Sequence, residues 1–257
     1  MLFTLTHEMH HLPCPNPEVD RILSGRTCSR DLIMEMADRL AAHHIPLVLY
    51  YNHGIMKGQD PQWQDAVGSR CSSKETYFTN YCNIIRWMGQ HYGKKVIAWW
   101  MDSAIAFREM KNVPFKQMTD AAREGNPERL VCYNPGLEDH STLVTPYQDY
   151  WAGEVCRMNY YPFGELTPSG LPWYSFAAWH LKRDRRFVGE WGIREDNAAI
   201  RYLPPSAESV ALFIHRFHSH GGAVTCNLLC YQDGSVLDED LQVMKEVRRK
   251  IRGQGSL

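Results

Sequence analysis

An apolar run at residues 96–103 ends in a carboxylate, and this is the strongest candidate for chemistry in the chain. The run reads Val-Ile-Ala-Trp-Trp-Met-Asp-Ser. Unbroken apolar residues suit a strand that is buried on both faces of a parallel sheet. Active sites of such sheets lie at the carboxyl ends of the strands. Asp102, directly after the run, is therefore a candidate catalytic acid. A helix cap or a rim salt bridge would explain it equally well.

Two further acids follow strand-like stretches. Glu154 ends Tyr-Trp-Ala-Gly-Glu, and Glu190 lies within Gly-Glu-Trp-Gly. Glycoside hydrolysis uses two carboxylates on either side of the scissile bond, about 5 Å apart when configuration is retained. Asp102 with either glutamate would satisfy this requirement. The alternative for each glutamate is a buried salt bridge, with Arg157 or Arg194 as partner.

The string His7-Glu8-Met9-His10-His11 matches His-Glu-x-x-His. That zinc motif needs both histidines on one face of a helix. Three prolines between residues 13 and 17 oppose a helix here, so we expect no metal. His7 at a strand end is better explained as a hydrogen-bonding residue in a pocket, or as a structural histidine. Asn134, in the turn Asn-Pro-Gly, would bind a ligand or only shape the turn.

Composition bounds the class of protein. The 257 residues are 44% hydrophobic with a net charge of −1, so nucleic acid and membrane surfaces are not expected partners. The 8 Trp and 13 Tyr suit sugar-binding walls or a dense core. Eight Cys occur without a Cys-x-x-Cys pair, which favours reduced thiols and a cytoplasmic protein. No stretch is long enough to span a bilayer. No Gly-x-Gly-x-x-Gly follows the first strand, and we expect no cofactor.

Strands and helices are expected to alternate along the chain. Expected strands cover residues 2–6, 45–51, 96–101, 130–133, 149–155, 176–179, 187–191 and 223–229. One expected helix starts after Ser29 and covers residues 30–42. The others cover residues 76–92, 114–125, 206–220 and 238–251. Loops are expected up to residue 26 and at residues 52–73. The alternation predicts an α/β fold, a (β/α)8 TIM-like barrel over residues 1–257 as one domain. An open doubly wound sheet is the alternative. The first strand begins at residue 2 with no helix before it, so either residues 160–197 supply two strands or the opening strand is absent. A neighbouring subunit of a homo-oligomer is a further possible source of that strand.

Several stretches together resemble glycoside hydrolase family 29, the α-L-fucosidases, and its more distant bacterial relatives. Residues 2–7, Leu-Phe-Thr-Leu-Thr-His, resemble its second barrel strand, and residues 47–51, Leu-Val-Leu-Tyr-Tyr, resemble its third. Residues 100–103, Trp-Met-Asp-Ser, resemble the Trp-Phe-Asp-Gly segment whose Asp is the nucleophile. Residues 223–229 with Asp233-Gly234 resemble the last strand and the segment after it. The altered histidine segment, the missing first strand and Ser103 in place of Gly depart from the family.

The resemblance implies a retaining exo-glycosidase of α-L-fucosidase type that acts by double displacement. Asp102 would be the nucleophile, with Glu154 or Glu190 as acid and base. We expect a carbohydrate substrate to contact His7, Tyr51, Trp100, Asn134 and Trp191. One alternative is a catalytically inactive barrel that binds carbohydrate or a partner protein. A weaker alternative is a metal hydrolase that uses His7 and His11.

Overall fold

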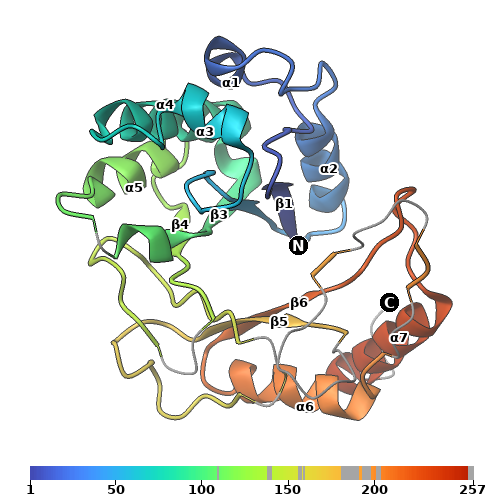
Figure 1. Cartoon of the computed structure of the whole chain (residues 1–257). Coiled ribbons are helices and arrows are strands. Elements are labelled where there is room, and N and C mark those ends of the chain that lie inside the picture. Colours follow the sequence, from blue (N-terminus) through green and yellow to red (C-terminus); the bar gives the residue numbers. More distant parts are fainter. Residues whose placement is uncertain are drawn as a thin grey trace. The chain divides into compact units, whose positions relative to one another are not determined.

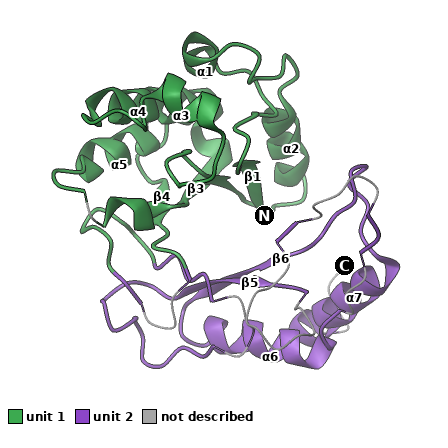
Figure 2. Cartoon of the chain, viewed as in Figure 1, with its two compact units in different colours: residues 1–136, 143–150 green, residues 137–142, 151–257 purple. Residues whose placement is uncertain are grey.

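The chain divides into two compact units (Figure 2). In the computed structural model, unit 1 comprises Met1–Gly136 and Leu143–Tyr150, and unit 2 comprises Leu137–Thr142 and Trp151–Leu257. The structure describes residues 1–108, 110–137, 141–155, 158, 160–180, 191–192, 198–200 and 204–253. The single domain expected over residues 1–257 remains a prediction. Among the described residues, no helix has the length and apolar character needed to cross a membrane.

Unit 1 contains a four-stranded parallel sheet in the order β1-β2-β3-β4 (Figure 1). The strands are β1 (Leu2–Thr6), β2 (Leu47–Tyr51), β3 (Val96–Met101) and β4 (Leu130–Tyr133). In the register, Tyr51 pairs with Met101, and Met101 pairs with Tyr133. The last residues of β2, β3 and β4 are therefore level, and the residues that follow them share one edge of the sheet.

The connections between these strands carry helices. α2 (Leu32–Ala41) follows β1, α4 (Glu75–Tyr92) follows β2, and α5 (Phe115–Arg123) follows β3. The 3-10 turns η1 (Gly93–Lys95) and η2 (Ala104–Phe107) flank β3. All four expected strands and three expected helices of this unit are confirmed, with end shifts of up to two residues. Their apolar periodicity is local, so the sequence alone identified them.

Two short helices were not expected. α1 (Pro17–Ile22) and α3 (Pro61–Val67) lie in segments for which the sequence predicts loops. Asn16 and Asp60 accept hydrogen bonds from backbone N–H groups of the first turn, and a proline occupies the next position in each case. This capping pattern was present in the sequence. The helices were missed because six or seven residues are too few to show helical periodicity.

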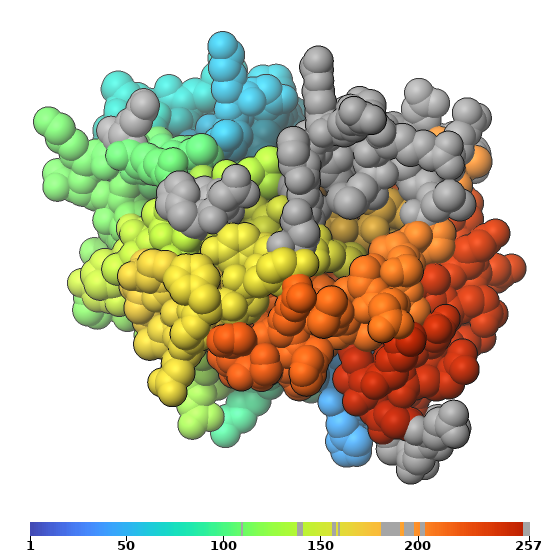
Figure 3. All heavy atoms as spheres, turned by 90° about the horizontal axis from the view of Figure 1, so that it is seen from below, coloured from blue at the N-terminus to red at the C-terminus, as the bar shows by residue number. Residues whose placement is uncertain are grey.

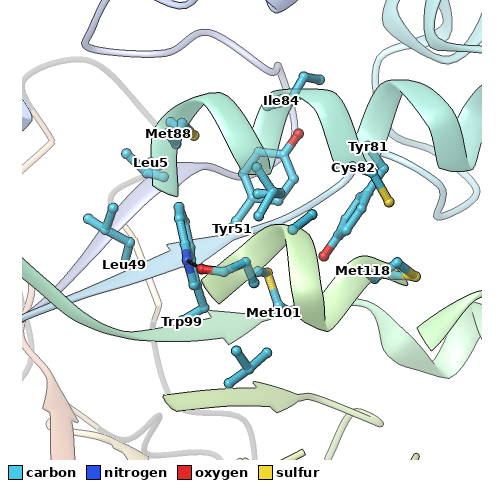
Figure 4. Close-up of a cluster of buried hydrophobic side chains, with 14 of the residues drawn as sticks. Leu5, Leu49, Tyr51, Tyr81, Cys82, Ile84, Met88, Trp99, Met101 and Met118 are labelled. Atoms are coloured by element: carbon cyan, nitrogen blue, oxygen red, sulfur yellow. Dashed lines mark hydrogen bonds between the residues drawn. The ribbon is translucent and has the colours of Figure 1, made fainter. Parts of the chain in front are cut away.

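The core of unit 1 lies between the sheet and the helices (Figure 4). Strand residues such as Leu49, Trp99 and Met101 are fully buried against Met88 of α4 and Met118 of α5. The Trp99 indole N–H donates to the Ala122 carbonyl at 3.1 Å, so the large ring is buried without an unpaired polar group.

Arg129 joins several elements through a buried guanidinium group. The residue is only 1% exposed. It donates to the carbonyl oxygens of five residues: Gly89, Gly93, Val96, Ala122 and Glu124. Burial lowers the pKa of Arg129 to about 10, which leaves it charged at neutral pH. The cation therefore satisfies carbonyls at the ends of α4 and α5, where no intrahelical N–H is available.

Two glycines permit this arrangement. A Cβ on Gly125, whose φ is +73°, would lie 2.5 Å from the Gly89 carbonyl oxygen. A Cβ on Gly89 would lie 2.9 Å from the Arg129 guanidinium. Side chains at either position would separate the two helix ends.

Unit 2 contains the parallel pair β5 (Tyr174–Ala178) and β6 (Ala223–Asn227), with α6 (Ala207–His218) and α7 (Asp238–Arg252). The two helices pack on each other and form part of the surface in Figure 3, where they are orange and red. Asp240 in the first turn of α7 is fully buried. It accepts hydrogen bonds from the Trp179 indole at 2.7 Å and from His180 at 3.0 Å. This contact fixes the start of α7 at the end of β5.

The strand expected at residues 149–155 is not formed. Only Glu154 makes an isolated bridge, to Phe176. Gly153 has φ +59°, and a Cβ there would lie 2.1 Å from the Tyr174 carbonyl oxygen, so the chain turns where a strand would continue. Of the strand expected at 187–191, all but Trp191 lies outside the described residues, and Trp191 is not in a strand. The α/β class with parallel pairing is confirmed. The described strands form sheets of four and two, so a closed eight-stranded barrel remains a proposal.

We predict that Arg129→Met lowers the free energy of unfolding by about 3 kcal/mol or more, because five carbonyls, three of them in buried hydrogen bonds, lose a charged donor. Urea titration followed by tryptophan fluorescence measures the change. Arg39→Met, at an exposed site on α2, is the matched control and should change stability by about 0.5 kcal/mol or less. Equal effects of the two substitutions would contradict the role of Arg129.

Candidate active site

Asp102 lies one residue beyond the end of β3. Its backbone N–H donates to the Tyr51 carbonyl at 2.9 Å, which continues the β2–β3 pairing. The side chain is partly exposed and lines a cavity of about 290 Å³. The other lining residues are His7, Glu8, Asn52, Met56, Lys57, Gly58, Gln59 and Ser103. Asp102 therefore faces an open cavity at the carboxyl edge of the sheet.

Groups from the two neighbouring strands bind the Asp102 carboxylate. The Tyr50 hydroxyl donates to Oδ2, and the Asn52 amide donates to the same oxygen at 3.1 Å. The Asn134 amide donates to Oδ1 at 2.8 Å. Hydrogen bonds to a carboxylate are among the stronger ones in proteins. Three donors to two oxygens fix the orientation of the carboxylate in the cavity.

The Tyr50 ring is held by its neighbours. It stacks on the Trp100 ring with a centroid distance of 5.1 Å and an interplanar angle of 17°. The His7 ring lies 6.0 Å away on a nearly parallel plane. These contacts restrict the ring that delivers the hydroxyl to Asp102.

The Asn52 amide has a defined orientation. Its Oδ1 atom accepts hydrogen bonds from the Gly54 N–H at 3.1 Å and from the Gln59 side-chain amide at 2.9 Å. Its nitrogen must then face Asp102 and Ser103, both of which offer oxygen acceptors. Gln59 thus supports Asp102 through Asn52.

Ser103 adopts a left-handed conformation, with φ +62°. This conformation favours glycine over other residues. Its hydroxyl accepts a hydrogen bond from Asn52 at 3.1 Å and donates to Asp102 Oδ2 at 3.4 Å. The serine that departs from the family pattern is therefore part of the hydrogen-bond network around Asp102.

Two buried histidines lie beside this network. His10 stacks on Trp63 at 5.3 Å, and its Nε2 lies 3.2 Å from the Asn52 carbonyl oxygen. His53 stacks on Phe107 at 4.8 Å, and its Nδ1 lies 2.6 Å from the Tyr77 hydroxyl. Burial lowers the pKa of His10 to about 4 and the pKa of His53 to about 3. Both rings are therefore neutral at neutral pH.

The structure brings together part of the expected site. His7 lines the same cavity as Asp102. Asn134 binds Asp102 and Trp100 supports Tyr50. Both are only 1% exposed and neither lines the cavity, so they position site groups and do not face a sugar. Tyr51, an expected sugar contact, is 2% exposed and belongs to the hydrophobic core. Tyr50 makes the contact with Asp102 instead, since successive side chains of a strand point to opposite faces.

The remaining expected residues belong to unit 2. Glu154 pairs with Phe176, and the Trp191 ring lies 5.0 Å from the Phe176 ring. Glu190 lies outside the described residues. The roles of Glu154, Glu190 and Trp191 remain predictions.

Glu8, Tyr50, Asn52 and Gln59 were not identified as site residues from the sequence. Asn52 directly follows a strand, as Asp102 does, and that position was the signal available for it. The positions of the other three depend on side-chain direction and on the course of the loops.

The zinc motif is not supported by the structure. Residues 7–12 contain no helix, and the His11 Nε2 atom lies 3.1 Å from the Arg26 guanidinium. The one-face arrangement required by the zinc motif is therefore not formed.

No protein-family model and no curated protein matches the sequence. Solved structures do match. An endo-fucoidan hydrolase, MfFcnA9 from glycoside hydrolase family 107, gives a TM-score of 0.70 at 13% identity. The match covers 99% of this chain and 57% of that chain. The chain is therefore similar in fold to this enzyme.

Two further matches belong to the same group. The endo-fucoidan hydrolase P5AFcnA, also from family 107, gives a TM-score of 0.68 at 16% identity and covers 97% of this chain and 80% of that one. The α-L-fucosidase AlfC from Lactobacillus casei, in complex with α-L-fucose product, gives a TM-score of 0.67 at 14% identity. That match covers 98% of this chain and 74% of the AlfC chain. The expected likeness to fucosidases is thus confirmed for the fold. This chain spans little more than half the length of MfFcnA9.

We predict that stability falls with acid because of His10 and His53. Their folded pKa values lie below the value of about 6.5 for an unfolded histidine, so the unfolded state binds more protons. Stability is complete above about pH 6.5 and is lost as the pH falls toward about 4, by up to roughly 1.4 kcal/mol per pH unit for each ring.

Urea unfolding at a series of pH values between about 7 and 4.5 measures this slope. His53→Gln should flatten the slope, whereas His43→Gln, at an exposed site, should leave it unchanged. Equal slopes for wild type and His53→Gln would contradict the prediction.

Proposed function

We propose that the protein is a retaining glycoside hydrolase that acts on α-L-fucosides, with Asp102 as nucleophile. The observation that supports this most strongly is the Asp102 carboxylate, fixed by Tyr50, Asn52 and Asn134 at the edge of a cavity. The likeness of the fold to enzymes named as fucosidase and fucoidan hydrolases favours fucose as the sugar. The same likeness supports completion of the fold as a (β/α)8 barrel, with or without an opening strand.

In the first step of the proposed reaction, an Asp102 oxygen attacks the anomeric carbon and the bond to the leaving oxygen breaks. A second carboxylic acid gives its proton to that oxygen. In the second step the resulting carboxylate takes a proton from water, and the water oxygen displaces Asp102 from the sugar. The Tyr50, Asn52 and Asn134 donors compensate the negative charge that returns to Asp102 when it leaves.

Three glutamates are candidates for the second carboxyl group. Glu154 and Glu190 are candidates from the sequence. Glu8 lines the same cavity as Asp102, on the loop that follows β1, and its side chain is 73% exposed. We place Glu8 first, because a retaining pair must face one sugar from within a single site.

Asp102→Asn should reduce hydrolysis of an aryl α-L-fucoside by about 10³-fold or more, because the covalent intermediate cannot form. Asp120→Asn, which removes an exposed acid paired with Lys116, is the matched control and should leave the rate unchanged. NMR of the wild-type reaction should show the α-anomer of fucose as first product. An inverted product, or equal rates for both variants, would contradict the proposal. Sugar binding without turnover on a panel of aryl glycosides would instead favour a non-catalytic carbohydrate-binding protein.

Glu8→Gln should slow the hydrolysis of fucosides with poor leaving groups by about 10²-fold. Activated aryl fucosides should lose less in the first step, because they depart with little protonation. Added azide, which needs no base, should restore turnover of the aryl substrate and yield fucosyl azide. Glu154→Gln and Glu190→Gln are the parallel variants. If one of them shows this pattern and Glu8→Gln does not, the acid and base role moves to that residue.

A further inference from the structure

A second cavity, larger than the one at Asp102, lies on unit 1. It has a volume of about 550 Å³ and lies between α4 and the segment that leads into α5. The helices α4 and α5 pack side by side (Figure 1). We call it the α4–α5 groove. The lining residues that matter here are Lys74, Glu75, Phe78, Asn83, Arg86 and Lys111. It shares no lining residue with the Asp102 cavity.

The charge of the α4–α5 groove is positive. Lys74, Arg86 and Lys111 line it together with one carboxylate, that of Glu75. Within the described part of the chain, no ion pair is formed by any of the three cations. In a protein with a net charge of −1, a hollow lined by three cations and one carboxylate attracts anions.

Their present hydrogen bonds leave these cations able to bind a ligand. The Lys74 ammonium donates to the carbonyl oxygens of Ser69 at 2.7 Å and Cys71 at 2.6 Å, which orients it and uses two of its three protons. Arg86 donates from Nη1 to the Asn83 side chain at 2.8 Å. Both groups are therefore directed by neutral acceptors and retain donors for an anion.

The length of the groove favours an extended ligand over a single ion. Lys74 and Arg86 are twelve residues apart along α4, which corresponds to about 18 Å at the helical rise per residue. Phe78 and Cys82 line the groove between them and offer apolar surface. Cationic ends with an apolar middle suit a chain of sugar rings that carries anionic substituents.

The groove begins at the same end of unit 1 as Asp102. α4 follows β2 and α5 follows β3, so the N-termini of both helices lie toward the carboxyl edge of the sheet. Lys74 precedes α4 and Lys111 precedes α5. Both lysines therefore lie toward the edge at which the Asp102 cavity opens.

We propose that the α4–α5 groove is a second binding site, for a glycan chain that carries sulfate or carboxylate groups. The lining of the groove supports the binding of an anionic chain. The choice of a glycan over other polyanions rests on the proposed function.

Calorimetric titration with dextran sulfate tests the proposal, with alginate as the carboxylate polymer and neutral dextran as the uncharged one. We expect the wild-type protein to bind dextran sulfate or alginate, more weakly at high salt, and not neutral dextran. Arg86→Gln/Lys111→Gln should weaken binding about tenfold or more. Lys116→Gln, which removes a cation on α5 that does not line the groove, should change affinity less than twofold.

Two measurements distinguish this site from the catalytic one. Asp102→Asn should retain polyanion binding, and the double variant should hydrolyse aryl fucoside at the wild-type rate. Equal affinities of the double variant and Lys116→Gln, or no binding of either anionic glycan, would overturn the proposal. Tighter binding of a single-stranded oligonucleotide of matched charge would overturn the assignment to a glycan.

Discussion

The parallel register of β2, β3 and β4 is the constraint on which the candidate site depends. It brings the ends of three strands level, so that Tyr50, Asp102 and Asn134 meet although 84 residues separate the first from the last. A shift of one residue in any pair would turn a side chain to the other face of the sheet. The two-sided burial of β3, with Trp99 and Trp100 on opposite faces and both at most 1% exposed, opposes such a shift.

The support of Asp102 extends beyond the groups that touch it. Asn52 is oriented by Gln59 and by the Gly54 N–H, and its carbonyl oxygen lies beside His10. His10 and His53 are buried and neutral, because burial lowers their pKa values. The histidine-rich segment that opens the chain therefore contributes hydrogen bonds and packing around the site. Acid weakens this support, because a buried imidazolium would have to be formed.

Charged groups at the two ends of the sheet in unit 1 have different roles, one in the candidate site and one in the stability of the fold. At the carboxyl edge of the sheet, polar side chains face a cavity. At the opposite end, Arg129 satisfies the carbonyls of two helix ends, and no carboxylate of the described residues pairs with it. A charge at that end stabilises helix termini, whereas the charge at the carboxyl edge is available to a ligand. The α4–α5 groove adds a third charged region, which is lined by three cations and one carboxylate.

The sequence by itself determined the strands and longer helices of unit 1, and it placed Asp102 at a strand end as a candidate acid, because apolar runs and helical periods are local properties. Tertiary structure decided which tyrosine reaches the carboxylate. In a strand buried on both faces, Tyr50 and Tyr51 are equivalent in sequence, and only the position of the sheet between core and cavity distinguishes them. It also placed Glu8 at the cavity and stopped the expected strand at Gly153, because both depend on where other segments pass. The sequence could name a candidate acid, but the hydrogen-bond partners of that acid are set by contacts between residues far apart in the chain.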